Sequence, residues 1–362
     1  MPSRPSLRQL TRLYTLSRSL PNFHHFHLLP PERSISTTPS PQAQVRIARN
    51  RNTFIQPRFT EADIPPIDFW KQHLVPPFIP AGTITPAECL EACKQYVPLA
   101  TSGKSNWAKT HLTKSPNPPP GKISLFALHY AATLLFLFAQ RTPGNRFLAM
   151  HILFTATMLG YAPSILTLGR MVYKGGGKGG DIHQPEYEYV KEGLEALVAA
   201  PNRSPEFRPD ALTLAALMQI KRNAPGNIAR AAKLLEDAEK TYVAAGGKAV
   251  WTWRGSAALA LSKIYLDQKQ PRRAREVLAA AAKESDDPVV CFRYAMMLEK
   301  SDPERSRLIQ RAAVSGVEEA AREMAEEMAA GSKEEGLGAW ERKVRELMAE
   351  EWRRIAGEKA TV

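Results

Sequence analysis

From about residue 205 onward, apolar residues recur at helical spacing in short segments that polar turns separate. The segment QPRRAREVLAAAAKE, which contains Pro271, aligns at an offset of 32 with DPERSRLIQRAAVSG, which contains Pro303. Each proline falls in the first turn of a predicted helix, where its missing N–H group leaves no hydrogen bond unmade. Another helix is predicted before each segment, over 256–268 and 288–300. Helix pairs that recur every 32 to 43 residues are typical of an α-solenoid.

Small and apolar residues occupy several of the aligned positions. The matched pairs are Pro271 with Pro303, Ala274 with Ser306, Leu278 with Gln310, and Ala282 with Val314. Small residues let neighbouring helices approach closely, and larger apolar side chains fill the space between them. The sequence therefore predicts an all-α fold in which antiparallel helix pairs stack as a solenoid over residues 185–357.

Residues 305–331, RSRLIQRAAVSGVEEAAREMAEEMAAG, carry the most specific pattern of the chain. A helix ends in Ala312 and Ala313, a turn contains Gly316, and a second helix begins near Ala320. This pattern resembles the Sel-one-like subtype of the tetratricopeptide repeat, although the Leu-Gly and Gly-x-Gly positions of that subtype are missing. The resemblance covers roughly 205–355 and implies a protein-binding helical array.

The segment that follows, EEGLGAWERKVRELMAEEWRRIAG, resembles the next helix of such an array. Trp340, Val344, Leu347 and Ile355 share one face of this helix. We expect the helix to act as the C-terminal cap of the array.

Two apolar runs precede the array, over 123–140 and 147–169. They are interpreted either as a buried helix pair or as a membrane hairpin, since both have similar hydropathy at this length. His129 and His151 favour burial in protein, because an ionisable group at mid-bilayer is costly. The second run also matches the repeat at an offset of 156, with the pairs Ile152 and Leu308, Leu153 and Ile309, Ala156 and Ala312, Gly160 and Gly316, and Ser164 and Ala320.

Prolines interrupt residues 43–120, and they remove backbone donors and disfavour helix at the preceding residue. We expect a basic arm, disordered or extended, with short helices, of which 86–97 is the best candidate. The arm also contains four large apolar residues, which indicate that it wraps onto the body or onto a partner: Phe69, Trp70, Phe78 and Ile79. Cys89 and Cys93 lie one helical turn apart without further ligands nearby, which predicts packed thiols rather than a metal site.

Residues 1–42 are rich in Arg and Ser, lack Lys and contain Glu32 as their one acidic residue. This composition is typical of a mitochondrial transit peptide; the alternative is a disordered basic tail. Arg33, Ile35 and Thr38 resemble a two-step processing pattern, with Arg at −2, a large apolar residue at +1 and Ser or Thr at +4. Cleavage after Ser34 and removal of an octapeptide then leave Ala43 as the N-terminus.

The net charge of +13 is unevenly distributed, with +4 over 1–42, +10 over 43–180 and −1 over 181–362. Attraction to RNA or anionic lipid is therefore expected through residues 43–180. The segment WTWRG places Trp251 and Trp253 near Arg254 at the entrance to a helix, which indicates either stacking on bases or packing across a repeat joint. No grouping typical of a catalytic, cofactor or metal site is evident, so none is predicted.

These patterns divide the chain into a transit peptide (1–42), a basic proline-rich arm (43–120), an apolar helix pair (121–173), a glycine-rich joint (174–184) and a repeat array with its capping helix (185–357). The expected function is that of a non-enzymatic scaffold or adaptor in the mitochondrial matrix, or on the matrix side of the inner membrane. By resemblance, it would bind unidentified proteins during assembly or biogenesis of a mitochondrial complex. The alternatives are an RNA- or mitoribosome-associated factor, and a repeat protein anchored in the inner membrane through 123–169.

Overall fold

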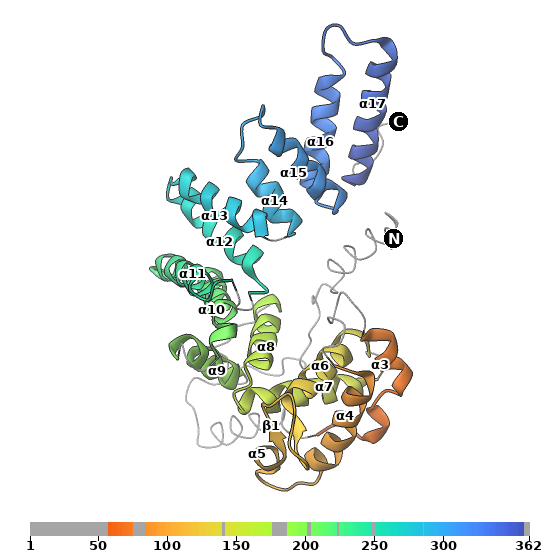
Figure 1. Cartoon of the computed structure of the whole chain (residues 1–362), viewed down its shortest axis with the longest axis vertical. Coiled ribbons are helices and arrows are strands. Elements are labelled where there is room, and N and C mark those ends of the chain that lie inside the picture. The colour runs from red at the N-terminus through yellow and green to blue at the C-terminus, as the bar shows by residue number, and fades with distance from the viewer. Residues whose placement is uncertain are drawn as a thin grey trace, which may run out of the picture. The chain divides into compact units, whose positions relative to one another are not determined.

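The computed structural model describes residues 57–74, 84–139, 142–175, 187–200, 204–222, 224–247, 251–284 and 286–357. Within them the chain forms fifteen α-helices, α3 to α17, with two short 3-10 helices and two two-residue strands. Helices adjacent in sequence pack against each other (Figure 1). This confirms the prediction of a mainly α-helical protein with sequential helix pairs, and it is consistent with a helical repeat.

The chain divides into two compact units, and the division falls between Leu214 and Ala215, inside α10 (Arg208–Arg222). The elements before α10 are η1 (Glu61–Asp63), α3 (Ile67–His73), α4 (Pro86–Thr101), α5 (Trp107–His111), β1 (Leu112–Thr113), β2 (Ile123–Ser124), α6 (Leu125–Phe138), α7 (Pro143–Met158), α8 (Ala162–Lys174), α9 (Glu188–Ala199) and η3 (Pro205–Phe207). Those after it are α11 (Asn227–Ala244), α12 (Arg254–Asp267), α13 (Pro271–Glu284), α14 (Pro288–Ala295), α15 (Pro303–Val314), α16 (Glu318–Gly331) and α17 (Ala339–Ile355).

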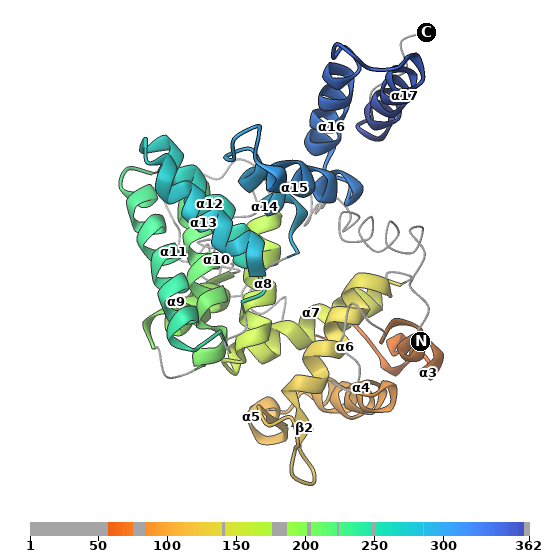
Figure 2. The same ribbon diagram turned by 45° about the horizontal axis from the view of Figure 1, so that its top comes forward.

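Helix α6 belongs to the buried core of the first unit. Each of its residues is buried or half-buried, and it packs against α4 and α7 (Figure 2). Leu128, Ala131 and Leu135 are completely buried. A helix that is apolar on all sides needs neighbours on all sides, and its two neighbours supply much of that cover.

Both histidines of the apolar runs have polar partners in this core. Nδ1 of His151 lies 2.7 Å from the hydroxyl of Tyr96, and that hydroxyl lies 2.9 Å from Oγ1 of Thr155. Nδ1 of His129 lies 3.0 Å from Oγ of Ser164. Burial lowers the pKa of His129 to about 4, so the ring is neutral at physiological pH. These hydrogen bonds offset the cost of burying the rings.

The two apolar runs form three helices rather than a pair. The first run begins as β2 and continues as the 14-residue α6. The second run is divided at Leu159–Tyr161 into the end of α7 and the start of α8. Within the described ranges, no helix combines the length and the hydropathy required to cross a bilayer.

Part of the segment expected to be an extended arm belongs to the same core. Helix α4 is 16 residues long, and a capping box between Thr85 and Glu88 defines its start. It continues past the predicted end at Val97 and contains Pro98 in its last turn. Its inner face buries an aromatic ring and two thiols against the helices that follow, so the arm is not separate from the body here.

The thiols of Cys89 and Cys93 are free and buried on this inner face. Burial, with a smaller contribution from Glu88, raises the pKa of Cys89 to about 12, so the thiolate does not form at neutral pH. The prediction of packed thiols is confirmed. Trp70 of α3 is also fully buried, and its indole N–H donates to the carbonyl of Pro65 at 3.0 Å.

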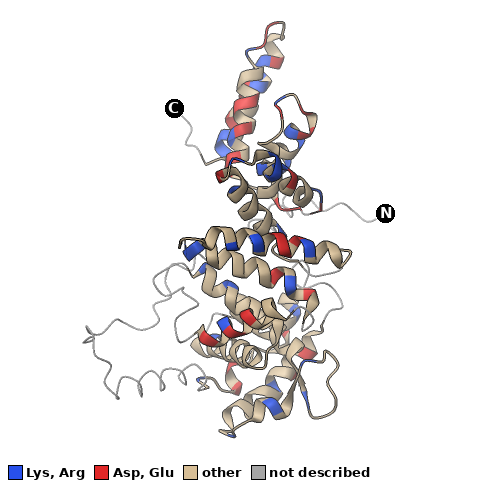
Figure 3. Ribbon diagram, turned by 90° about the vertical axis from the view of Figure 1, so that its left-hand side faces the viewer, with Lys and Arg blue, Asp and Glu red and all other residues tan. Residues whose placement is uncertain are grey.

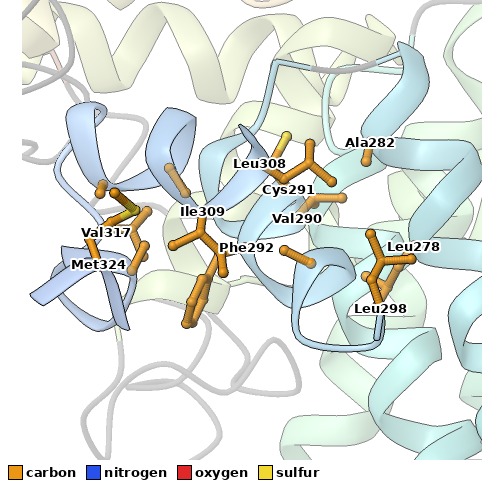
Figure 4. Packing of buried hydrophobic residues seen from close by; sticks show 14 of the residues in the cluster. Leu278, Ala282, Val290, Cys291, Phe292, Leu298, Leu308, Ile309, Val317 and Met324 are labelled. Carbon is orange, nitrogen blue, oxygen red and sulfur yellow. The ribbon is translucent and has the colours of Figure 1, made fainter. Parts of the chain in front are cut away.

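In the second unit, each helix packs mainly on the helices before and after it in sequence. One core cluster lies between α13, α14, α15 and α16 (Figure 4). It contains Leu278, Phe292, Leu308, Ile309 and Met324. A second cluster joins Ala216 of α10 to side chains of α11, α12 and α13. The apolar core is therefore assembled in steps along the chain.

Four helices end in the same hydrogen-bonded turn. At the end of α7, Tyr161 N donates to Ala156 O at 3.0 Å and Gly160 N to Thr157 O at 2.8 Å, with φ of Gly160 at 69°. At the end of α15 the equivalent bonds are Val317 N to Ala312 O and Gly316 N to Ala313 O, with φ of Gly316 at 85°. These are Schellman turns, in which a residue with positive φ closes the helix. The equivalent bonds also occur at the ends of α11 and α12, where Gly246 and Lys269 have positive φ.

The residue with positive φ in these turns is glycine at positions 160 and 316 but lysine at position 269, and this difference predicts opposite effects of substitution on the free energy of unfolding. We expect Gly160→Ala and Gly316→Ala each to lower the free energy of unfolding by about 1 kcal/mol, because a Cβ at positive φ is strained. Lys269→Gly should raise it by up to about 1 kcal/mol, since glycine removes the strain that Lys269 already carries at φ 58°. Urea unfolding measures all three; effects of the same sign at the three positions would contradict the assignment.

Candidate interaction surfaces

The alanines of the repeat pattern are buried, but the structure does not bring them into one site. Ala312, Ala313 and Ala320 lie in the cluster between α13 and α16. Ala274 lies in the cluster of α10 to α13, and Ala156 is buried at the end of α7 in the first unit. Each alanine stands at a close helix contact, so these residues set helix spacing rather than bind a ligand.

The prolines and glycines of the pattern mark helix ends. Pro271 and Pro303 are the first residues of α13 and α15. Gly160 and Gly316 occupy the turns described above. The residues proposed for presequence processing, Arg33, Ile35 and Thr38, lie outside the described residues.

The buried faces of α13 and α15 coincide at an offset of 31, although the two helices begin 32 residues apart. At 31, the buried pairs are Ala274 and Arg305, Leu278 and Ile309, Ala281 and Ala312, and Ala282 and Ala313. At 32, Leu278 would match Gln310 and Ala282 would match Val314, both of which are exposed. One residue rotates a helix face by about 100°, so the shared N-terminal proline does not fix which face is buried.

A buried arginine joins α15 to α16. The guanidinium of Arg305 is almost inaccessible and forms ion pairs with both Glu323 and Glu327. Burial disfavours its charge, but the hydrogen bonds to the two carboxylates raise its pKa. This three-residue ion cluster fixes the register of the two helices, because removal of one partner leaves buried charge without a counter-ion.

The segment WTWRG forms a second cluster of this kind. Arg254 at the start of α12 pairs with Glu239 of α11 and Glu284 of α13. Its guanidinium lies 5.4 Å from the ring centroid of Trp251 and 4.7 Å from that of Tyr242. Of the two interpretations of WTWRG, base stacking and packing across a joint, the structure has packing.

The outer surfaces of α11 to α16 carry both acidic and basic side chains. Figure 3 shows acidic and basic residues interspersed along these helices. Exposed ion pairs such as Arg272–Glu276 and Arg293–Glu319 contribute to this pattern. In the parts of the chain that the structure describes, no group of three or more His, Cys, Asp or Glu could bind a metal ion.

One part of the first unit differs, because the exposed charges of its described residues between Glu91 and Asp181 are all basic. The sequence between Glu91 and Asp181 contains no acidic residue. Exposed basic side chains in this range include Lys94, Lys104 and Lys109. Lys114 is also exposed, and its Nζ donates to the carbonyl of Gly160 at 2.9 Å, which ties the loop after β1 to the turn after α7. A positive surface of this kind attracts anionic polymers.

The apolar face of the capping helix, which was identified from the sequence, points away from the array. Trp340, Leu347 and Ile355 are 77%, 51% and 46% exposed. The side of α17 that contacts the array carries instead Ala349, Trp352 and Ala356, with Arg345 donating to the carbonyl of Gly331 at 2.6 Å. The reason is steric, because alanine permits α16 and α17 to approach closely while the bulky stripe does not.

Three features of these surfaces were not predicted from the sequence: the partners of Arg305, the partners of Arg254 and the outward orientation of the apolar face of α17. The carboxylate partners of Arg305 and Arg254 lie 15 to 30 residues away, beyond the range of local spacing rules. The outward face of α17 could have been found from the small residues at 349 and 356, which mark the opposite side of the helix.

Comparison of the chain with models of known protein families, with curated proteins and with solved structures gives no significant match. The class that the structure defines is therefore the coarse one, a helical protein with sequentially packed helix pairs.

The Arg305 cluster predicts a large cost for losing one side chain. We expect Arg305→Ala to lower the free energy of unfolding by about 3 kcal/mol, because Glu323 and Glu327 lose their buried counter-ion. The matched control is Arg293→Ala, whose partner Glu319 lies 3.7 Å away at the surface, and which should cost less than about 1 kcal/mol. Thermal or urea unfolding compares them, and equal effects would contradict the structural role of Arg305.

Proposed function

We propose that the chain is a non-enzymatic helical-repeat scaffold or adaptor of mitochondria, which binds protein partners during the assembly or biogenesis of a mitochondrial complex. The observation that carries this proposal is the stepwise packing of α11 to α17, in which each helix contacts its neighbours in sequence. An array of this kind offers an extended surface at little cost in stability, because its core is complete without the outer face.

The mechanism is presentation of surface rather than chemistry. Clusters such as Arg305 with its two glutamates fix the helices relative to each other, so partner-binding side chains would be positioned before contact. The mixed charges of the outer faces favour polar recognition, in which complementary charge selects the partner. The resemblance of 305–331 to the Sel-one-like repeat supports the same class of function, by analogy of fold.

Mitochondrial localisation rests on residues 1–42 and is tested by the N-terminus of the imported protein. After incubation of the full chain with isolated mitochondria, N-terminal sequencing should detect Ala43. Arg33→Ala should abolish the first cleavage and leave a longer product, because the Arg at −2 is the recognition feature. Arg18→Ala, outside the pattern, is the control. A chain that stays outside the organelle would overturn the localisation.

Partner binding is tested by affinity purification of the tagged full chain from mitochondria, followed by cross-linking and mass spectrometry. We expect a defined protein in near-equal amount, with cross-links to lysines of the array such as Lys263, Lys283 and Lys333. Nuclease treatment should not release it. Recovery of no stoichiometric protein, or recovery that nuclease abolishes, would contradict the scaffold.

A second candidate, an RNA- or mitoribosome-associated factor, is favoured by the acid-free stretch between Glu91 and Asp181. In that case the same purification yields RNA, and binding falls steeply as salt rises, because phosphate contacts release counter-ions. Substitution of Lys104 and Lys109 by Glu would weaken RNA binding, whereas it would leave contacts to the array unchanged. The purification therefore separates the two candidates.

A further inference from the structure

The outward face of α17 is an apolar stripe at the end of the array. It consists of Trp340, Val344, Leu347, Met348 and Ile355, which lie on the side of the helix away from Ala349 and Ala356. Val344 is half-buried and the other four are exposed. The terminal unit of a helical array normally has a polar outer face, which keeps the array soluble and ends the stacking. Here α17, the last helix within the described residues, presents the type of surface on which a further helix packs.

The stripe is nearly palindromic about the midpoint between Leu347 and Met348. In an antiparallel pair of α17 helices with a two-fold axis at that midpoint, Trp340 lies opposite Ile355 and Leu347 lies opposite Met348. Val344 lies opposite Glu351, a polar residue on the same face of α17 as the stripe. An isologous contact requires such self-complementarity, since the same surface must match itself.

Charge is also complementary in this register. Glu341 lies opposite Arg354, and the two-fold axis produces this pair twice. Glu351 already accepts a hydrogen bond from Nε of Arg354 in its own helix at 3.0 Å. The charge of the Glu351 carboxylate is therefore balanced by Arg354 before the two helices meet. A single polar residue among apolar ones also helps to fix the register of paired helices.

We propose that the outward face of α17 is a self-association surface, through which two copies of the chain form an antiparallel two-fold dimer. The α17 helix of the second copy would cover the exposed apolar stripe of the first, and the reverse. Because a two-fold contact is closed, the assembly stops at the dimer and does not grow into a filament. This proposal is independent of the identity of any scaffold partner. The stripe is about 22 Å long, since Trp340 and Ile355 are separated by 15 residue steps along the helix. An interface of that size is small, so a dissociation constant of about 10 µM is expected.

The first experiment measures the mass of the full chain by sedimentation equilibrium from about 1 to 100 µM. We expect a monomer–dimer equilibrium, and Leu347→Glu should weaken it about tenfold or more, because it places two carboxylates near the axis. The matched control is Leu266→Glu on α12, where Leu266 is similarly exposed at 47% and the equilibrium should not change. A monomer throughout, or a dimer that Leu347→Glu leaves intact, would overturn the proposal.

The second experiment tests the direction of the helices and does not depend on a disruptive variant. Met348→Cys should form an intermolecular disulfide under mild oxidation, because position 348 lies beside the axis. Trp340→Cys should not, since the two copies of that position would lie about 22 Å apart and a disulfide requires Cα atoms within about 7 Å. The unsubstituted chain is the control, as Cys89, Cys93 and Cys291 are buried. Failure of Met348→Cys to cross-link, or equal cross-linking at both positions, would contradict the antiparallel dimer.

Discussion

Short helices impose the main constraint on this molecule. An isolated helix of fewer than about 15 residues is marginal in water, and most helices here are near or below that length. Each therefore depends on burying one face against a neighbour, and the neighbour is usually the next helix in the sequence. Small residues at the contacts, such as Ala312 and Ala320, make that burial efficient. The Schellman turns then reverse the chain so that the next helix returns against the last.

The two units meet this constraint in different ways. In the first unit every residue of α6 is buried or half-buried, and the polar groups it brings inside are matched, as His129 is by Ser164. In the second unit no single helix is central, and the core is divided into successive clusters. The inter-helix arginines belong to this second arrangement, because Arg254 and Arg305 each connect neighbouring helices by ion pairs. The first unit is consequently built around one buried helix, whereas the second unit has successive apolar clusters that follow the order of the helices in the sequence.

The sequence predicted the starts of the array helices better than their ends, because proline signals at helix starts are local, whereas the helix predicted over 288–300 ends at Ala295. Prolines at helix starts and the Ala-x-x-x-Gly turn at 156–160 and 312–316 depend on residues within one or two turns. Helix faces were harder to predict. The buried face of α15 differed by one residue from the proline-based alignment, and the apolar stripe of α17 proved to face outward, because burial depends on the steric fit of a neighbour that local spacing does not describe. The partners of the buried arginines were unpredictable for the same reason.

The contact order of the second unit has a consequence for how the chain acquires its structure. Because its helices pack on neighbours in sequence, few contacts join distant parts of the unit, and proteins rich in local contacts fold rapidly. A chain that emerges end-first from a narrow channel can then complete one helix pair after another, without waiting for its last residues. The arrangement suits vectorial folding, and it limits the time for which unpaired apolar faces are exposed to aggregation.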